Sequence, residues 1–472
     1  MNAAPRARRA ALVVAATAVL LPGCGLQRYE ARPLDPGAVL AARVARDLAD
    51  PGLAAFAAQA GYPGAWPPPR WDLTSLTLAA LYAHPGLAEQ RTRLALAQAA
   101  QITAGRFPAP TIEIPYEHHG DVARDQQGAT TIGARLGLTF EPPARRAARV
   151  AIAQYEAEAA QWDLRDRAWR LRSRLRQAVV ERLRAGEAAA LAGERAALAA
   201  QALAASARRA AAGEGSAFEE SAIRMQVQRA RLDALAAEAA LADARGALAQ
   251  TLGVVEEALG RTPVDLAPLP VPQALPDADE LQARAMLGRA DLRAGLARYA
   301  ASDAGVRLAV ARQYPEVTLS PGFLFDQGDN IWSLAGAFAL PIANPNRGPI
   351  AEANARRDAA AAAFEALQYD VLSQLRAARS RLRASELAQA QAEALVAAAD
   401  EHLVLRQRQA QAGLADRLDV LHASIEATAA REASCAARAQ LQAAVGAIED
   451  ALQQPSDGAG FPQPEGIRET PR

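Results

Sequence analysis

The residues best suited to metal chemistry are two histidines and two aspartates in one short stretch. His118 and His119 lie close to Asp121 and Asp125 in the sequence, and imidazole and carboxylate groups are able to bind a metal ion together. The alternative is a solvated set of side chains on an outer loop, which we favour. With five histidines, two cysteines and three methionines, the chain has no dense metal-ligand cluster and no disulfide framework.

Other enzyme chemistry has less support in the sequence. We find no Ser-His-Asp set and no glycine-rich phosphate loop, so we expect neither catalysis nor a cofactor. The 52 basic residues, all arginine, balance 52 acidic residues. The formal net charge is zero, so the composition gives no excess of positive charge that would indicate nucleic-acid binding.

The N-terminus has the layout of an export signal. Arginines precede an apolar run from Ala10 to Leu21, which is too short to span a membrane. Leu21-Pro22-Gly23-Cys24 resembles the lipobox of bacterial lipoproteins, in which the cysteine becomes the lipidated first residue of the mature chain. Pro22 departs from the usual small residue, and a plain secretory signal is the alternative. Gly25 takes the place of the aspartate that retains lipoproteins at the inner membrane, so we expect sorting to the outer membrane.

The longest uninterrupted segment runs from Ala144 to Ala212, without proline and with only Gly186 and Gly193 as glycines. Its residues are strong helix formers, which predicts one helix about 100 Å long. A helix of this length indicates a coiled coil, a membrane span or a helical repeat, and frequent arginine and glutamate exclude a span in lipid. We therefore expect it to lie against other long helices.

Between Pro108 and Pro142 the hydrophobic period changes from 3.6 to 2, which is typical of half-buried strands. Apolar residues alternate with polar ones near Ile112 and again from Ile132 to Phe140. The stretch between them, residues 118–128, is polar and loop-like, so the pair predicts a hairpin.

The same order of elements occurs twice, with equivalent residues such as Gly213 and Gly413 about 200 positions apart. The copies differ in the loop between strands, about eleven residues in the first and about five in the second. The predicted helices are 71–107, 144–212, 217–252, 279–313 and 349–412, with a return helix ending before Pro455. His84-Pro85-Gly86 is a candidate kink near the start of the first. The strands predicted in the second copy are 316–325 and 331–340. The predicted segments are a signal peptide 1–23, an extended segment 24–70 with one short helix near 36–60, a first repeat 71–253, a linker 254–278, a second repeat 279–452 and a tail 453–472.

The predicted strands suit the outer membrane, because about ten tilted residues cover about 25 Å, the height of the apolar band there. Open sheet edges in hydrocarbon leave backbone groups unpaired, so lipid-facing strands need a closed sheet. One chain has only four strands. Three chains would give twelve and leave an open lumen, whereas the alternative is a soluble four-stranded sheet capped by helices.

Several short motifs resemble the TolC family of outer-membrane efflux channels, particularly its lipidated members. They are Gly23-Cys24 followed by Tyr29 and Pro33, His84-Pro85-Gly86-Leu87, Arg289-Ala290-Asp291-Leu292, Arg347-Gly348-Pro349-Ile350, and the turn from Gly413 to Ser424 with Leu418-Asp419-Val420-Leu421. The resemblance covers nearly the whole mature chain, in the same order and spacing in both copies.

The resemblance implies a mainly α fold with a small β part, in which a duplicated helix-hairpin-helix unit trimerises. The homotrimer would form a twelve-stranded transmembrane β-barrel on a long periplasmic α-helical barrel, lipid-anchored in the bacterial outer membrane. Its implied role is the passive exit duct of a tripartite RND-type efflux pump, with a periplasmic adaptor and an inner-membrane pump as partners. A periplasmic adaptor or a structural coiled-coil lipoprotein is the alternative. Metal ions, drugs and other organic solutes all remain open as cargo.

The two turns between long helices are the expected adaptor-facing tips; alternatively, they are merely turns. The tip residues are Gly213, Glu214, Gly215, Gly413, Leu414 and Ala415. The expected lipidation site is Cys24, and the resemblance implies that Asp416, Asp419 and His422 line a periplasmic aperture. His422 stands where the family normally has a second aspartate. Leu414, Leu418, Leu421 and Ile425 form an apolar seam for a neighbouring helix, and an ordinary solvated helix face is the alternative for the acidic side.

Overall fold

A computed structural model describes residues 27–120, 130–214, 216–262, 264–267, 269, 277–340, 342, 345–456 and 461. The chain divides into two units, Met1–Ala45 and Arg46–Arg472, which are described separately. In the first unit, helix α2 spans Pro36–Val44, and the Asp35 carboxylate caps it by accepting from the backbone N–H of Gly37. The predicted lipidation site Cys24 lies outside the described residues.

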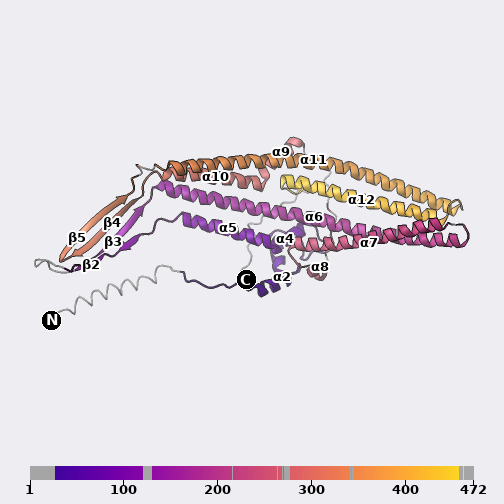
Figure 1. The fold of residues 1–472 in the computed structure, drawn as a ribbon, viewed down its shortest axis with the longest axis horizontal. Helices are drawn as coiled ribbons and strands as arrows, with labels where there is room; N and C mark the ends of the chain where they lie inside the picture. Colours follow the sequence, from indigo (N-terminus) through magenta and orange to yellow (C-terminus); the bar gives the residue numbers. More distant parts are fainter. Residues whose placement is uncertain are drawn as a thin grey trace. The chain divides into compact units, whose positions relative to one another are not determined.

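The second unit holds the remaining described elements (Figure 1). Its helices are α3 (Pro51–Gln59), α4 (Leu73–Ala83), α5 (Pro85–Ala104), α6 (Pro143–Ala211), α7 (Ala217–Leu252), α8 (Glu256–Arg261), α9 (Ala278–Gly288), α10 (Ala290–Ala311), α11 (Arg347–Gln411) and α12 (Arg417–Leu452). Its strands are β1 (Thr111–Glu113), β2 (Tyr116–His118), β3 (Thr130–Phe140), β4 (Val317–Asp326) and β5 (Asp329–Phe338).

Three predicted helices are each divided in two, and one of them divides at its predicted kink. The helix expected near 36–60 is α2 and α3, because Asp50 starts a new helix with Pro51 at its first position. The helix expected at 71–107 is α4 and α5, because His84 precedes a proline and is extended, with φ −72° and ψ 123°. The helix expected at 279–313 breaks at Arg289, which has the same extended conformation without a following proline. The short helix α8 at the start of the linker was not predicted.

The long helices are confirmed. α6 has 69 residues and α11 has 65, and each reverses into a 36-residue return helix, α7 or α12. α6 packs against α7 and α5 along its length, while α11 packs against α12 and α10. α6 also contacts α10 and α12, which joins the two repeats. Two shorter helices therefore cover what one long helix spans, as Figure 1 shows.

One antiparallel sheet combines the strands of both repeats. β1 and β2 both pair with β3, β3 pairs with β4, and β4 pairs with β5. The first predicted strand is interrupted at Pro115, which has no N–H to donate to the ladder. The loop between β4 and β5 has two residues, not about five. Gln327 and Gly328 both have positive φ, 48° and 108°, which suits a tight hairpin turn.

The sheet has one apolar and one largely polar face. The apolar face carries Ile112, Ile114, Tyr116, Ile132, Leu136, Leu138, Phe140, Val317, Leu319, Phe323, Phe325, Trp332, Leu334 and Phe338. The opposite face carries Thr111, Glu113, Glu117, Thr131, Arg135, Thr139, Thr318, Ser320, Asp326, Asp329 and Ser333, with Leu324 and Ile331 as apolar exceptions. Trp332 is 81% exposed, so no described part of the chain covers the apolar face there. The predicted alternation is confirmed.

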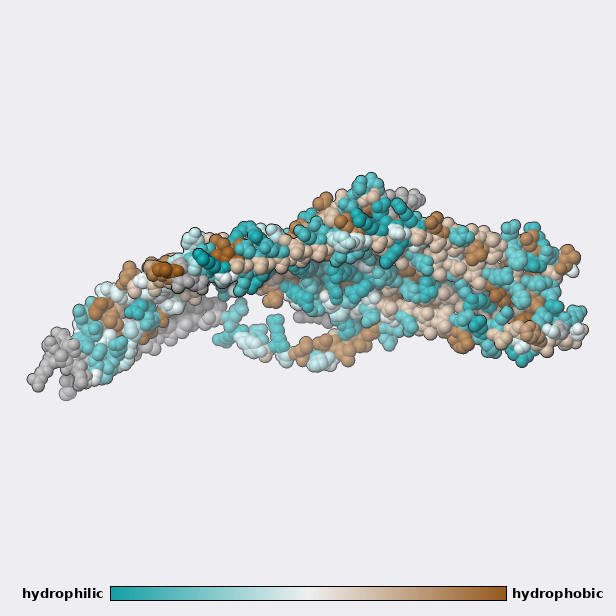
Figure 2. Space-filling view, turned by 45° about the horizontal axis from the view of Figure 1, so that its top comes forward, coloured by the Kyte–Doolittle hydropathy of each residue, from teal (hydrophilic) through white to brown (hydrophobic). Residues whose placement is uncertain are grey.

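The main hydrophobic core lies where α4 packs on α6. Trp71, Leu76, Leu164 and Leu175 are buried in it, and Trp71 also bridges the linker at Leu266. Hydrophilic and weakly hydrophobic residues are interspersed over the helical surface seen in Figure 2, and strongly hydrophobic residues form scattered patches. Among the described residues, none of the helices combines the length and hydropathy needed to cross a membrane.

Candidate functional site

The two predicted tips have the same backbone geometry. Gly213 and Gly413 have φ of +81° and +71°, which favours glycine. In each turn the next residue donates its N–H back into the long helix, from Glu214 to the Arg209 carbonyl and from Leu414 to the Gln409 carbonyl. Apart from its neighbours in the chain, no described residue has an atom within 4 Å of the position a Cβ would take at either glycine, so both turns are open on that side. Gly215 lies outside the described residues, and Ala415 is half-buried.

Asp416 and Asp419 form a capping box at the start of α12. The Asp416 carboxylate accepts from the Asp419 N–H at 2.9 Å, and the Asp419 carboxylate accepts from the Asp416 N–H at 3.0 Å. We assigned both aspartates to an aperture and missed this capping role. Their spacing of three residues at a helix start is the signal that predicts it.

Arg209 of α6 connects the two tips. Its Nη1 lies 2.8 Å from Asp416 Oδ2 and 3.8 Å from Glu219 Oε1. Beneath this ion pair, Leu418 and Leu421 are buried against α6 and α7, in contact with Ile223. The hairpins of the two repeats are therefore held together within one chain.

The predicted apolar seam is only partly correct. Leu418 and Leu421 are buried, and Ile425 packs against the cluster around Val227. The prediction that Leu414 belongs to the seam is wrong, because this side chain is 80% exposed at the turn.

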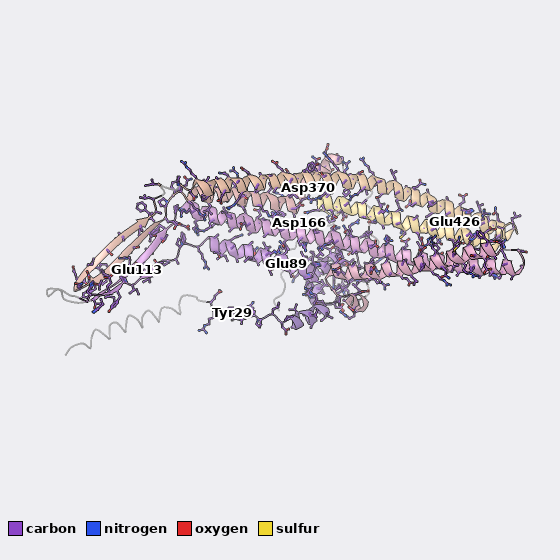
Figure 3. All side chains as sticks on the ribbon, viewed as in Figure 1. Tyr29, Glu89, Glu113, Asp166, Asp370 and Glu426 are labelled. Atoms are coloured by element: carbon purple, nitrogen blue, oxygen red, sulfur yellow. The ribbon has the colours of Figure 1, made fainter. Side chains whose placement is uncertain are left out.

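The polar side of α12 near the tip is exposed. Asp419 and His422 both face solvent within this chain, so an aperture role stays a prediction. Glu426, one turn further, lies 3.4 Å from His402 Nδ1 on α11, and Arg406 donates to the other ring nitrogen of His402. Figure 3 labels Glu426 near the hairpin turns and Glu113 in the sheet at the opposite end of this unit.

The candidate metal ligands do not assemble in the described part of the chain. His119 Nε2 lies 3.0 Å from Thr131 Oγ1, which donates to Asp326, so His119 belongs to a chain of hydrogen bonds across strands. His118 ends β2 and is exposed. Asp121 and Asp125 lie outside the described residues. Within those described, no group of three or more metal-binding side chains occurs.

A buried ionic network, which sequence reasoning missed, joins α6 to α12. Glu449 Oε2 lies 2.7 Å from Arg172 Nη1 and 3.3 Å from Arg176 Nε, and all three side chains are buried. Ser456 donates to the other oxygen of Glu449. Burial opposes ionisation of Glu449, but Arg172, Arg176 and Ser456 outweigh it and hold its pKa below the ordinary value. The sequence pattern of α6 and α12 predicts that both segments are helical, but it does not indicate which of their charged residues meet.

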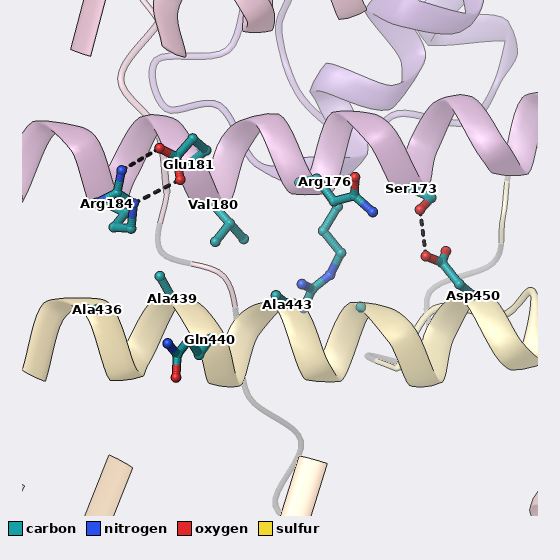
Figure 4. A pocket seen from close by; sticks show the side chains of 12 residues that line it. Ser173, Arg176, Val180, Glu181, Arg184, Ala436, Ala439, Gln440, Ala443 and Asp450 are labelled. Atoms are coloured by element: carbon teal, nitrogen blue, oxygen red, sulfur yellow. Dashed lines mark hydrogen bonds and ion pairs between the residues drawn. The ribbon is translucent and has the colours of Figure 1, made fainter. Parts of the chain in front are cut away.

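Asp450 extends this network into a groove between α6 and α12 of about 530 Å³ (Figure 4). It accepts hydrogen bonds from Trp169 Nε1 and Ser173 Oγ, and burial raises its pKa. At the other end of the groove, Arg184 donates to both oxygens of Glu181. Arg184 and Glu181 therefore pair with each other, whereas Asp450 is held by two neutral donors, and these contacts join α6 to α12 at the Asp450 end of the groove.

The chain was compared with known proteins. Residues 281–453 match the family model described as Outer membrane efflux protein. The solved structure of the outer-membrane channel OprN is 21% identical, with a TM-score of 0.68, over 92% of this chain and 100% of that chain. The resemblance to the TolC family is confirmed.

Two further solved structures share the fold. The outer membrane protein VceC from Vibrio cholerae is 21% identical with a TM-score of 0.66, over 82% of this chain and 96% of that one. The MtrE outer membrane channel from Neisseria gonorrhoeae is 19% identical with a TM-score of 0.67, over 81% and 89%. No curated protein sequence matches the chain. The predicted TolC-like fold class, mainly helical with a small sheet, is thus confirmed.

Proposed function

We propose that this protein is the outer-membrane exit channel of a tripartite efflux system and conducts solutes passively. The observation that carries this proposal is the two-faced sheet at one end of a helical wall. In the described chain its apolar side chains are largely exposed and its other face carries most of the strands' polar side chains, as lipid and an aqueous lumen require.

The sheet edges argue for closure with other copies of the chain. β1 and β2 form one edge and β5 the other, and each has a partner on one side only in the described chain. Neighbouring strands alternate in direction, so β5 runs antiparallel to the β1 of an identical neighbour. Three copies placed in this way close an antiparallel barrel and leave an open lumen, whereas two would fill it with side chains.

The helices would then extend into the periplasm, with their tips farthest from the membrane. The open turns at Gly213 and Gly413 are the surfaces we assign to a periplasmic adaptor, which links the channel to an inner-membrane pump. Lipidation at Cys24 would add an anchor in the outer membrane. The family match and the fold support this assembly.

The alternative, a periplasmic adaptor or structural coiled-coil lipoprotein, makes a different prediction on a denaturing gel. Unheated channel should migrate as a large, heat-sensitive trimer, because a closed barrel has no unpaired edges to open. An adaptor should migrate as a monomer with or without heating. A monomer in the unheated sample from outer membranes would contradict the proposed function.

A further inference from the structure

The polar face of the sheet has one row that differs from all the others. Glu113 pairs with Arg135, Arg135 with Gly322, and Gly322 with Ser333, so the row crosses β1, β3, β4 and β5 in that order. Arg135 Nη1 lies 3.1 Å from Glu113 Oε2. Arg135 is the single arginine within the five described strands. The row therefore holds two long charged side chains followed by two small residues.

The neighbours of Arg135 on this face are unusually small. Gly133 and Gly137 flank it two positions away in β3, and Gly322 faces it across the ladder. A Cβ at Gly322 would lie 3.5 Å from Arg135 Cγ and 3.0 Å from Ser333 Oγ, so the arginine stem lies over the glycine. The Arg135 and Glu113 side chains remain 43% and 65% exposed. Within this row of the described strands, the ion pair is followed only by Gly322 and Ser333, while Leu324 lies on the next row, over Gly133.

The charge around the pair is uneven. Towards the β4–β5 turn, the same face carries Glu117, Asp326 and Asp329. Towards the helices it carries Thr139 and Thr318, which hydrogen-bond to each other at 3.1 Å. Arg135 is thus a cation that lies between the acidic end of the sheet, at the β4–β5 turn, and the helices. Glu113 is its ion-pair partner.

We propose that Arg135 and Glu113 form a ring of ion pairs that sets the charge selectivity of the membrane section of the pore. This inference rests on the proposed function, in which the polar face lines the lumen of a trimeric barrel. Three copies would place three cations and three anions at one level of the channel. Charged side chains projecting into a pore bias permeation by their sign.

The pair makes opposite predictions for its two members. Arg135→Ala leaves three uncompensated carboxylates, and the reversal potential of bilayer currents under a KCl gradient should shift towards cation selectivity. Glu113→Gln leaves three uncompensated guanidinium groups, and the potential should shift towards anion selectivity. Arg135→Lys keeps the charge and should retain native selectivity. The exchange variant Arg135→Glu with Glu113→Arg should return close to native.

A thiol at position 135 gives a second readout. Cys435 is buried, so Arg135→Cys adds a new accessible thiol, and a cationic reagent should shift selectivity in the direction opposite to an anionic one. Variants are compared only as heat-sensitive trimers. Native channels that conduct, together with unchanged reversal potentials in both single variants, would overturn the inference and leave the channel assignment intact. Native protein that forms no channels would instead overturn the proposed function.

Discussion

Residues Gly253 and Gln453 occupy equivalent places in the two repeats and meet different demands. Both end a return helix in the left-handed region, with φ of 79° and 50°. At Gly253 a side chain has no room, because a Cβ would lie 2.8 Å from His84 Cα. At Gln453 the side chain forms two hydrogen bonds. Its amide oxygen accepts from the Ala290 N–H, and its amide nitrogen donates to Asp166. The same backbone turn therefore takes glycine once and glutamine once.

The Gly253→Ala substitution should destabilise the protein through both conformation and contact. A left-handed non-glycine residue costs about 1–2 kcal/mol, and the clash with His84 adds to it. Gly413→Ala is the matched control, because it has similar φ and open space. We expect a clearly lower apparent melting temperature by circular dichroism for Gly253→Ala than for the control. Equal melting temperatures would show that the close approach is unimportant.

Removing the charge of Glu449 should be far more damaging than removing an exposed charge. Glu449→Gln leaves Arg172 and Arg176 buried without their anion, which typically costs about 3–5 kcal/mol. The control Glu187→Gln breaks an exposed pair with Arg438, for which at most about 1 kcal/mol is expected. Urea unfolding in detergent measures the difference, and similar midpoints would contradict the account of the network.

The low pKa of Glu449 gives the sign of its pH dependence. A carboxylate whose pKa is depressed in the folded state contributes stability above its ordinary value of 4.5, and loses it as pH falls through the folded pKa. Native protein should therefore lose more stability on acidification below this range than Glu449→Gln does. The thermal melts of both proteins across this pH range provide the check, and parallel losses would be the contrary result.

At the scale of elements, helix boundaries marked by proline or glycine were predictable, and those set by tertiary contacts were not. α6 and α7 lie within a residue of the predicted bounds because Pro142, Gly213 and Gly253 mark their ends. The break at Arg289 follows Gly288, but no proline stands there and Gly288 is itself the last residue of α9. It is stabilised by contacts distant in sequence, since Arg289 donates to the carbonyls of Asp450 and Ala451. The face alternation of the strands was also predictable, whereas the Arg135 row needed the register.

Two substitutions of Asp419 at the start of α12 can distinguish the effect of its charge from the effect of its helix-capping hydrogen bond. Asp419→Ala removes both the negative charge and the acceptor for the Asp416 N–H, while Asp419→Asn removes only the charge. If Asp419 lines an aperture, both variants should reduce the cation preference of single-channel currents equally. The alanine variant alone should lose about 1 kcal/mol of helix stability. Native ion selectivity in both variants would remove the aperture assignment.

At the scale of the whole second unit, the duplicated repeats place two helix-hairpin turns, α6–α7 and α11–α12, at one end and a single shared sheet at the other. The repeats are joined along α6, by the Arg209–Asp416 ion pair near the turns and by the Glu449 network, which joins the middle of α6 to the end of α12. The fold class could be predicted because the repeat and the change of period are visible in the sequence. The ion pairs between the repeats could not be predicted, because each joins residues more than about 200 positions apart.

Blocking both turns tests the adaptor surface. Gly213→Trp with Gly413→Trp places bulky groups where the chain leaves open space, so efflux by the assembled pump should fall while heat-sensitive trimers persist. The double alanine variant controls for the left-handed conformation. Normal efflux in the tryptophan variant would mean that the tips are merely turns.

The central claim is that copies of this chain close their sheets into an open pore. Its most direct test is the conductance of purified, full-length protein reconstituted into a planar lipid bilayer, with its mass measured in the same detergent. We predict a mass of three chains and discrete current steps that disappear after heating to the monomer. Well-folded, single-chain protein that produces no current steps would contradict the account.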